Sequence, residues 1–171
     1  GSENVASIVA LGAACELAGK HIQDENTRVK ALRDKLETGL LKAVPECRIN
    51  GDPANRLPNT TNISFKYVEG EAILLLLDQE GICASSGSAC TSGSLEPSHV
   101  LRSMGVPFTY AHRSVRPPLS RYTTEAEIDT ALEVLPRVIT PLRELSPHHN
   151  LSDDALPAAG PPGPRPPLSR P

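Results

Sequence analysis

The chain has 171 residues, which is enough for one domain with a packed core. It contains no tryptophan, two phenylalanines and three tyrosines, so the core must be aliphatic. A formal net charge of −3 leaves no basic surface of the kind that binds nucleic acid. The longest notable apolar run, 72–77, is much shorter than a membrane span, and the first residues do not resemble an export signal. We therefore expect no nucleic-acid partner, no membrane partner and a cytoplasmic location.

The first half of the chain predicts two helices followed by two strands. Apolar residues at helical spacing indicate a helix over 4–20 and a second helix that ends at Pro45. Cys47–Ile49 is a short strand candidate, because the turn dipeptide Asn50-Gly51 follows it. Apolar and polar residues alternate from 61 to 67, which indicates a half-buried strand.

The next segments alternate between helix and strand. The leucine-rich stretch 70–80 predicts a helix that ends at Gly81, followed by a short buried strand over 82–84. A further helix is expected from Pro97 to Gly105, since proline fits the first turn of a helix. The last strand is expected over 114–119.

The C-terminal part predicts one long helix and a tail. Thr124 and Glu127 form a capping box at the start of the helix, and Pro136 and Pro141 are expected to kink it. Residues 147–171 are expected to be a disordered, proline-rich tail, because seven prolines and few bulky apolar residues follow position 150. The domain is therefore expected to span residues 1–146.

The stretch 85–94 contains Cys90 among residues that are otherwise all small. Small residues bury too little apolar surface to offset the entropy of being held still, so this stretch is expected to be a mobile loop. Cys90 is its only strong nucleophile, and the alternative is a surface loop with an incidental cysteine. The other cysteines are Cys15, Cys47 and Cys83, and none of the four has metal-site spacing. We expect reduced thiols, with Cys90 the most reactive and Cys15 and Cys83 buried on apolar faces.

The continuous sequence 68–102, together with Asn59-Thr-Thr-Asn-Ile-Ser-Phe65 and the stretch 120–129, closely resembles the cysteine desulfurases of the nitrogen-fixation (NifS-like) type. These class V aminotransferase-like enzymes use pyridoxal phosphate to take sulfur from L-cysteine, release L-alanine and supply iron–sulfur cluster assembly. The resemblance implies an α/β fold, the small C-terminal domain of a fold-type I enzyme with a mainly antiparallel short sheet flanked by helices. It also implies a homodimer and an iron–sulfur scaffold protein as partner.

The resemblance assigns three residues. Cys90 matches the cysteine that accepts the sulfur as a persulfide and acts as a transient iron–sulfur ligand shared with the scaffold. Arg116 matches the arginine that binds the substrate carboxylate through two parallel hydrogen bonds, and its alternative is a surface ion pair. Ser2, in the motif 1–4, matches the hydroxyl residue that contacts the cofactor phosphate of the partner subunit, and its alternative is a plain helix cap.

The chain departs from the family pattern in two respects. Pro117 and Pro118 follow Arg116 where the family has an apolar residue and then serine, and two prolines can displace the strand that carries Arg116. None of the five lysines resembles the cofactor-lysine motif. We therefore expect a C-terminal domain truncated at its N-terminal side that is inactive alone. The alternative is a catalytically dead fragment or binding module that docks on a desulfurase or a scaffold protein.

Overall fold

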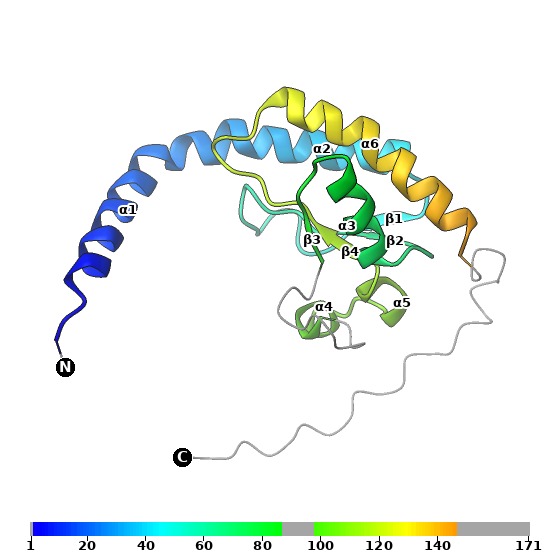
Figure 1. The fold of residues 1–171 in the computed structure, drawn as a ribbon, viewed down its shortest axis with the longest axis horizontal. Coiled ribbons are helices and arrows are strands. Elements are labelled where there is room, and N and C mark those ends of the chain that lie inside the picture. Colours follow the sequence, from blue (N-terminus) through cyan, green and yellow to red (C-terminus); the bar gives the residue numbers. More distant parts are fainter. Residues whose placement is uncertain (1, 87–97, 147–171) are drawn as a thin grey trace, which may run out of the picture.

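A computed structural model describes residues 2–86 and 98–146, so the predictions for Cys90, Pro97 and the tail 147–171 lie outside the described residues. Within these limits the chain forms a small sheet with helices on both faces and a long helical segment at its N-terminal end (Figure 1). This arrangement confirms the expected α/β class with a short antiparallel sheet.

The N-terminal helical segment is continuous. Helix α1 spans Val5–Asp24, a π-helical turn η1 spans Glu25–Val29, and helix α2 spans Lys30–Ala43. The two helices predicted from the sequence are present, joined by the π-helical turn rather than a loop. Their environments differ: α2 buries Leu32, Leu36 and Leu40, whereas α1 buries no residue.

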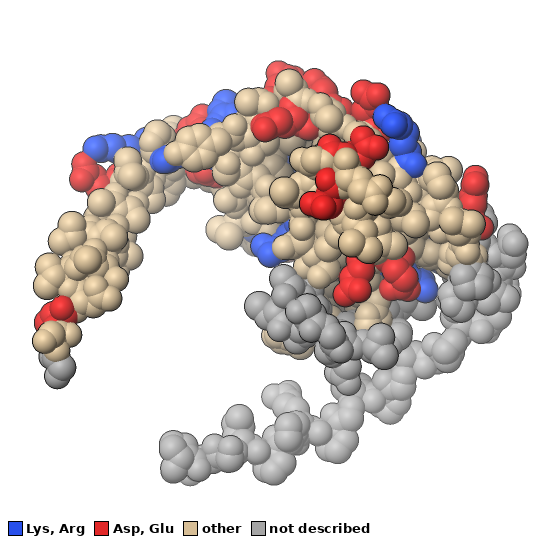
Figure 2. Space-filling model, in the orientation of Figure 1, with Lys and Arg blue, Asp and Glu red and all other residues tan. Residues whose placement is uncertain are grey.

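The exposed helix α1 bears on the membrane question. The helical segment from Val5 to Ala43 contains a window of 18 residues with mean hydropathy 1.4, none of it buried, and so meets the length and composition of a membrane span. Uninterrupted apolar runs in the sequence do not reveal this segment, because glycine, alanine and polar residues interrupt them. Figure 2 shows a largely uncharged surface toward the N-terminal end of this segment. A largely apolar helix with no buried residue is typical of a segment covered by further protein or by a membrane.

The sheet has four short strands in the order β1-β2-β4-β3, and all neighbours are antiparallel. Strand β1 spans Cys47–Ile49, β2 spans Ile63–Phe65, β3 spans Ser85–Ser86 and β4 spans Ser114–Arg116. The two central strands, β2 and β4, are therefore far apart in sequence. Gly51 has a φ of 99°, as expected for the turn that follows β1.

One face of the sheet carries the aliphatic core. Helices α2, α3 (Gly70–Gln79) and α6 (Glu125–Glu144) contribute to this core, and Ile63, Phe65 and Val115 enter it from the sheet. The capping box at the start of α6 is present: the hydroxyl of Thr124 accepts from the backbone N–H of Glu127, and the backbone N–H of Thr124 donates to the Glu127 carboxylate.

Two short helices, α4 (His99–Ser103) and α5 (Phe108–Ala111), lie on the opposite side of the sheet from α2 and α6 (Figure 1). The hydroxyl of Ser64 in β2 donates to the carbonyl of Tyr110 in α5 at 2.9 Å. The sequence did not predict α5, because four residues are too few for a helical period to be recognised.

Two local predictions were wrong. Residues 82–84 form no strand, and β3 begins directly after them, at Ser85. The strand expected over 61–67 is only three residues long, and all three are buried because helix α5 covers Ser64 on the supposedly exposed face. Helix α6 continues through both of its prolines, and the kink expected at Pro136 and Pro141 stays a prediction.

Candidate functional site

The register of the sheet aligns four polar residues from four strands or strand ends. The backbone N–H of Asn50 donates to the carbonyl of Asn62 at 2.8 Å, so these residues face each other. The pairing of β2 with β4 places Arg116 opposite Asn62. Ser85 of β3 then pairs with Arg116 on its other side. We call Asn50, Asn62, Arg116 and Ser85, in this order across the sheet, the polar row.

The polar row points away from the aliphatic core. Directly opposite residues of an antiparallel ladder have side chains on the same face, and consecutive residues of a strand alternate between faces. Ile63 and Val115, which are next to Asn62 and Arg116 in sequence, are 1% and 2% exposed in the core. The row therefore occupies the face that carries α4 and α5.

Arg116 is the charged member of the row, and it is exposed. Among the described residues, no side chain forms an ion pair or hydrogen bond with its guanidinium group. The surface ion pair considered as the alternative is therefore absent from residues 2–86 and 98–146. An unpaired arginine on a sheet face can bind a carboxylate ligand through two parallel hydrogen bonds.

The two prolines after Arg116 do not remove its strand from the sheet. Pro118 forms an antiparallel bridge with Thr60, in the same register as the rest of the β2–β4 ladder. The backbone N–H of Leu119 donates to the carbonyl of Asn59 at 3.0 Å, so hydrogen bonding resumes directly after the prolines. The missing N–H groups fall beyond the last residue of β4, where the strand tolerates their loss.

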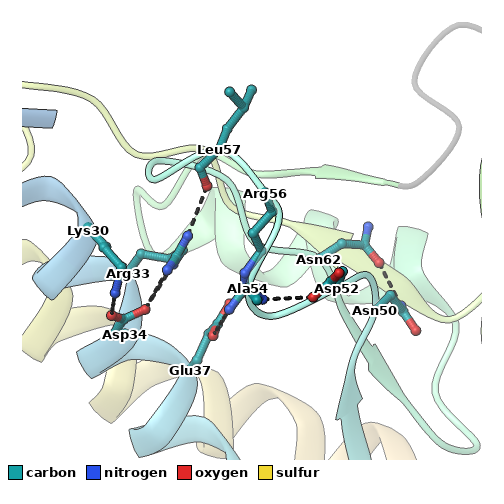
Figure 3. A network of polar contacts seen from close by, with 10 residues as sticks. All are labelled: Lys30, Arg33, Asp34, Glu37, Asn50, Asp52, Ala54, Arg56, Leu57 and Asn62. Atoms are coloured by element: carbon teal, nitrogen blue, oxygen red, sulfur yellow. Dashed lines mark hydrogen bonds and ion pairs between the residues drawn. The ribbon is translucent and has the colours of Figure 1, made fainter. Parts of the chain in front are cut away.

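Side-chain hydrogen bonds fix one end of the row. The amide nitrogen Nδ2 of Asn50 donates to Oδ1 of Asn62 at 2.6 Å (Figure 3). The same nitrogen donates to the hydroxyl of Ser64 at 2.7 Å. Asn50 is only 5% exposed, and Ser64 is fully buried. Since Ser64 in turn donates to the carbonyl of Tyr110, the chain of hydrogen bonds runs from α5 to Asn62.

A second polar network joins α2 to the loop before β2 (Figure 3). Arg56 donates to both carboxylate oxygens of Glu37, at 2.6 and 2.7 Å, with both side chains largely buried. Arg33 is 2% exposed and donates to the Asp34 carboxylate and to the carbonyl of Leu57. This α2–loop network holds the segment that leads into the strand carrying Asn62.

The predicted sulfur acceptor, Cys90, lies outside the described residues, as does any iron–sulfur ligation by it. Within the described parts of the chain, no group of three or more His, Cys, Asp or Glu side chains could hold a metal ion. The base of the Cys90 segment is described, because Ser85 and Ser86 form β3 beside β4. The polar row therefore meets the start of the segment that carries Cys90.

Ser2 lies at the opposite end of the molecule. It is exposed and precedes α1, whose N-cap is Asn4: the side chain of Asn4 accepts from the backbone N–H of Ser7 at 3.2 Å. Ser2 is thus not the helix cap that was considered as its alternative role. Figure 1 shows the N-terminus at the far end of the helical segment, away from the sheet. A contact with a partner subunit's cofactor stays a prediction.

The described residues do not fit the binding of pyridoxal phosphate by this chain alone. The five lysines are Lys20, Lys30, Lys35, Lys42 and Lys66. Three of them pair with surface carboxylates on helices, Lys66 pairs with Glu46, and Lys42 is exposed on α2. Neither the small apolar cavity in the core nor the groove between α3 and α6 is lined by a lysine. We therefore derive no chemical step through the cofactor from these residues.

The cysteine predictions need one correction. Cys15 and Cys83 are exposed rather than buried, and Cys47 is half-buried. Cys15 lies on α1, which contacts nothing that could cover it in the described chain, and Cys83 lies in a segment that forms no strand. Periodicity identified the apolar face of α1, but periodicity alone does not show that a partner covers that face.

A comparison with known families identifies the family of this chain. The chain belongs to the class-V aminotransferase family, whose sequence profile matches residues 1–131. Enzymes of this family depend on pyridoxal phosphate.

Within this family the relatives of the chain are cysteine desulfurases. Cysteine desulfurase 2 of Trichormus variabilis is 61% identical over 156 residues, which cover 91% of this chain and 39% of the relative. Cysteine desulfurase NifS of Azotobacter vinelandii is 61% identical over 148 residues, or 86% of this chain and 37% of the relative. The chain thus aligns with part of these cysteine desulfurases and spans well under half of their length.

Solved structures agree on the fold. A NifS-like protein matches with a TM-score of 0.71 and 30% identity, covering 83% of this chain and 35% of the other. A NifS-like protein from Rickettsia africae matches with a TM-score of 0.68 and 34% identity, covering 81% of this chain and 35% of the other. The fold is therefore that of part of a NifS-like enzyme of fold type I.

Proposed function

We propose that the chain acts as the C-terminal part of a cysteine desulfurase that transfers the sulfur of L-cysteine to Cys90 and releases L-alanine. The observation that supports this proposal most directly is the pairing of Ser85 with Arg116 in the sheet. Cys90 follows Ser86 by four residues, and four residues span at most about 14 Å. The four residues are therefore a short link between the Cys90 thiol and the strand beside the arginine that would bind the substrate carboxylate.

Each group has a defined role in this proposal. The Arg116 guanidinium binds the carboxylate of L-cysteine and so fixes the orientation of the substrate. The thiolate of Cys90 attacks the substrate sulfur and becomes a persulfide. The electron pair of the broken carbon–sulfur bond must be accepted by chemistry that the described residues do not supply. Pyridoxal phosphate provides such chemistry in this family, so the complete reaction also needs residues beyond the described ones to hold the cofactor.

We also propose the partners, the oligomeric state and the location of this enzyme. A scaffold protein for iron–sulfur clusters would receive the sulfur, and Cys90 would serve as a transient cluster ligand on it. The enzyme would be a homodimer in which Ser2 contacts the cofactor phosphate of the partner subunit. A cytoplasmic location suits exposed thiols such as Cys15 and Cys83, because the cytoplasm keeps cysteines reduced.

The test is a chimera in which the matching segment of the A. vinelandii NifS enzyme is replaced by residues 1–148 of this chain. With L-cysteine we expect catalytic formation of alanine, because 61% of the aligned residues are identical. Cys90→Ala should abolish alanine formation. Arg116→Lys should raise the KM for L-cysteine about tenfold or more, because lysine cannot form two parallel hydrogen bonds with a carboxylate.

Cys83→Ser is the matched control for Cys90→Ala, since Cys83 is an exposed cysteine just before β3. It should retain the activity of the unchanged chimera. Activity that survives Cys90→Ala would contradict the proposed role of Cys90. A folded chimera that binds the cofactor but forms no alanine would favour the alternative of a catalytically dead binding module.

A further inference from the structure

We propose that Asn62 is a second carboxylate-binding residue beside Arg116, and that Asn50 is the positioning residue that orients it. This inference rests on the proposed function, because it assumes that Arg116 binds the carboxylate of an amino acid.

Asn62 and Arg116 are neighbours on one face of the sheet. The β2–β4 pairing places them directly opposite each other. Residues directly opposite in an antiparallel pair have Cβ atoms roughly 5 Å apart. A carboxylate bound by the Arg116 guanidinium is therefore within reach of the Asn62 side chain. Among the described residues, the Asn62 amide nitrogen has no hydrogen-bond partner of its own.

The orientation of the Asn62 amide follows from the chain of hydrogen bonds that begins at α5. The carbonyl of Tyr110 can only accept, so the hydroxyl of Ser64 must donate to it. Ser64 oxygen is then an acceptor, and the atom of Asn50 that faces it must be the donor nitrogen. The same nitrogen faces Asn62, which must therefore present its oxygen.

This orientation directs the two amide hydrogens of Asn62 away from Asn50. Figure 3 shows the Asn62 nitrogen on the opposite side of the amide from its contact with Asn50. In the polar row the neighbour of Asn62 on the side away from Asn50 is Arg116. Because Asn50 is buried and makes two hydrogen bonds through one nitrogen, Asn62 cannot turn over without breaking this network.

The Arg116 guanidinium and the Asn62 amide together determine which kind of ligand can bind. The guanidinium group offers two parallel donors, and the amide adds a neutral donor at its side. Such a set fits the two oxygens of an α-carboxylate and gives no comparable interaction with an amino acid amide. Asn62 would thus strengthen binding and favour ligands that carry a free carboxylate.

The test uses the full chain labelled with ¹⁵N and titrated with L-alanine, the amino acid released in the proposed reaction. We expect saturable NMR shifts of the Asn62 side-chain NH₂ and the Arg116 Nε–H, with one common midpoint. Alaninamide, which lacks the carboxylate, should produce neither shift.

Asn62→Asp is the informative variant, because aspartate still offers an oxygen to Asn50 but replaces the donor with a negative charge. It should weaken L-alanine binding at least about tenfold. Asn26→Asp is the matched control: it makes the same charge change at an exposed position of η1, and binding should stay within about twofold of the unchanged chain.

The outcomes separate this inference from the proposed function. If Arg116 responds with saturation while Asn62 does not and Asn62→Asp binds normally, the role of Asn62 is wrong and that of Arg116 stands. If neither side chain responds at saturating concentrations, both the carboxylate site and this inference are wrong. If Asn62→Asp does not fold, as judged by loss of its dispersed NMR spectrum, the test is the shift of the Asn62 side-chain NH₂ in the unchanged protein. A saturable shift with L-alanine supports the role of Asn62, and its absence contradicts that role.

Discussion

At the residue scale, the chain places buried polar groups where they determine the position of the site. Glu37 and Arg56 join α2 to the loop before β2, and Asn50 joins β1 to Asn62. Glu37, Arg56 and Asn50 are largely buried, so the loss of one partner leaves a buried charge or a buried polar group without its hydrogen bond. Substitutions at such contacts should therefore be costly.

Glu37→Ala should lower the free energy of unfolding by about 3 kcal/mol, because it leaves the largely buried guanidinium of Arg56 unpaired. Urea denaturation followed by circular dichroism measures this change. The matched control is Glu133→Ala, which removes a carboxylate that faces Arg137 at 3.7 Å on the exposed surface of α6 and should change stability little. Equal effects of the two substitutions would contradict the role given to the α2–loop network.

The described thiols should differ in reactivity. Burial raises the pKa of the Cys47 thiol, and its Sγ donates to the carbonyl of Val44 at 3.1 Å. Since the thiolate is the reactive form, Cys47 should react with iodoacetamide at pH 8 more slowly than the exposed Cys15 and Cys83. Mass-spectrometric mapping of partially alkylated native protein measures the order, and it also tests the prediction that Cys90 reacts fastest. Labelling of Cys47 ahead of Cys15 would contradict this order.

The same thiol gives a pH dependence of stability. A raised pKa means that the folded chain holds the Cys47 proton more tightly than the unfolded chain does. The stabilising contribution is therefore complete below the ordinary pKa of about 9 and is lost as the pH rises through the folded-state pKa. Between pH 8 and about 11 the unchanged chain should lose more stability than Cys47→Ala, as compared by urea titrations. Parallel curves for the two proteins would show that Cys47 is not the group responsible.

At the element scale, the start of α3 is packed against the chain entering β4. A Cβ atom on Gly70 would lie 2.9 Å from the carbonyl oxygen of Ser114 and 3.2 Å from that of His112. Both are backbone atoms, which cannot move aside as a side chain can. The absence of a side chain at Gly70 therefore sets the distance between α3 and the strand that carries Arg116.

Gly70→Ala should lower the melting temperature and shift the backbone amide resonances of residues 114–116, because α3 and β4 must separate. Gly19→Ala is the matched control: nothing lies within 4 Å of its Cβ position in α1, and alanine favours a helix over glycine by about 1 kcal/mol. That variant should be as stable as the unchanged chain or more so. A Gly70→Ala protein with an unchanged melting temperature and spectrum would show that the close approach is not required.

The sequence predicted the elements whose signals are local. Helix α2 was visible from its apolar spacing, and α6 from its capping box, because both signals lie within a few residues. The row residues Asn50 and Asn62 were seen only as a turn residue and a polar position in an alternating segment. Their role depends on pairing with Arg116 across the sheet, and sequence spacing carries no information on which strands are paired.

At the scale of the whole molecule, the covered sheet contrasts with the uncovered helix α1. Helices α2, α3 and α6 bury side chains in the core. In contrast, Ile8, Val9 and Leu11 of α1 are exposed by 58%, 65% and 66%. The curated relatives contain more than twice the length that this chain spans. An apolar helix without a buried residue agrees with a part that functions together with further protein.

The 171-residue polypeptide alone should therefore not act as a catalytic desulfurase. A lysine amine must bind the cofactor in this family, and the described lysines pair with surface carboxylates or lie exposed. The purified polypeptide mixed with pyridoxal phosphate and L-cysteine should form no more alanine than the cofactor does without protein. Catalytic alanine formation that disappears on Cys90→Ala would contradict this expectation and reveal a cofactor site within the chain.

The register of β2 and β4 has a consequence for how the gene can change. Deleting one residue within 60–65 or 114–118 would reverse which side chains face the core, so that Arg116 or Asn62 would exchange places with Val115 or Ile63. A one-residue deletion in the loop 51–59 does not change which side chains of β2 and β4 face the core. Insertions and deletions that survive natural selection should therefore collect in the loop and be absent from the two central strands. The site is protected by the parity of the strand positions as well as by the identity of its residues.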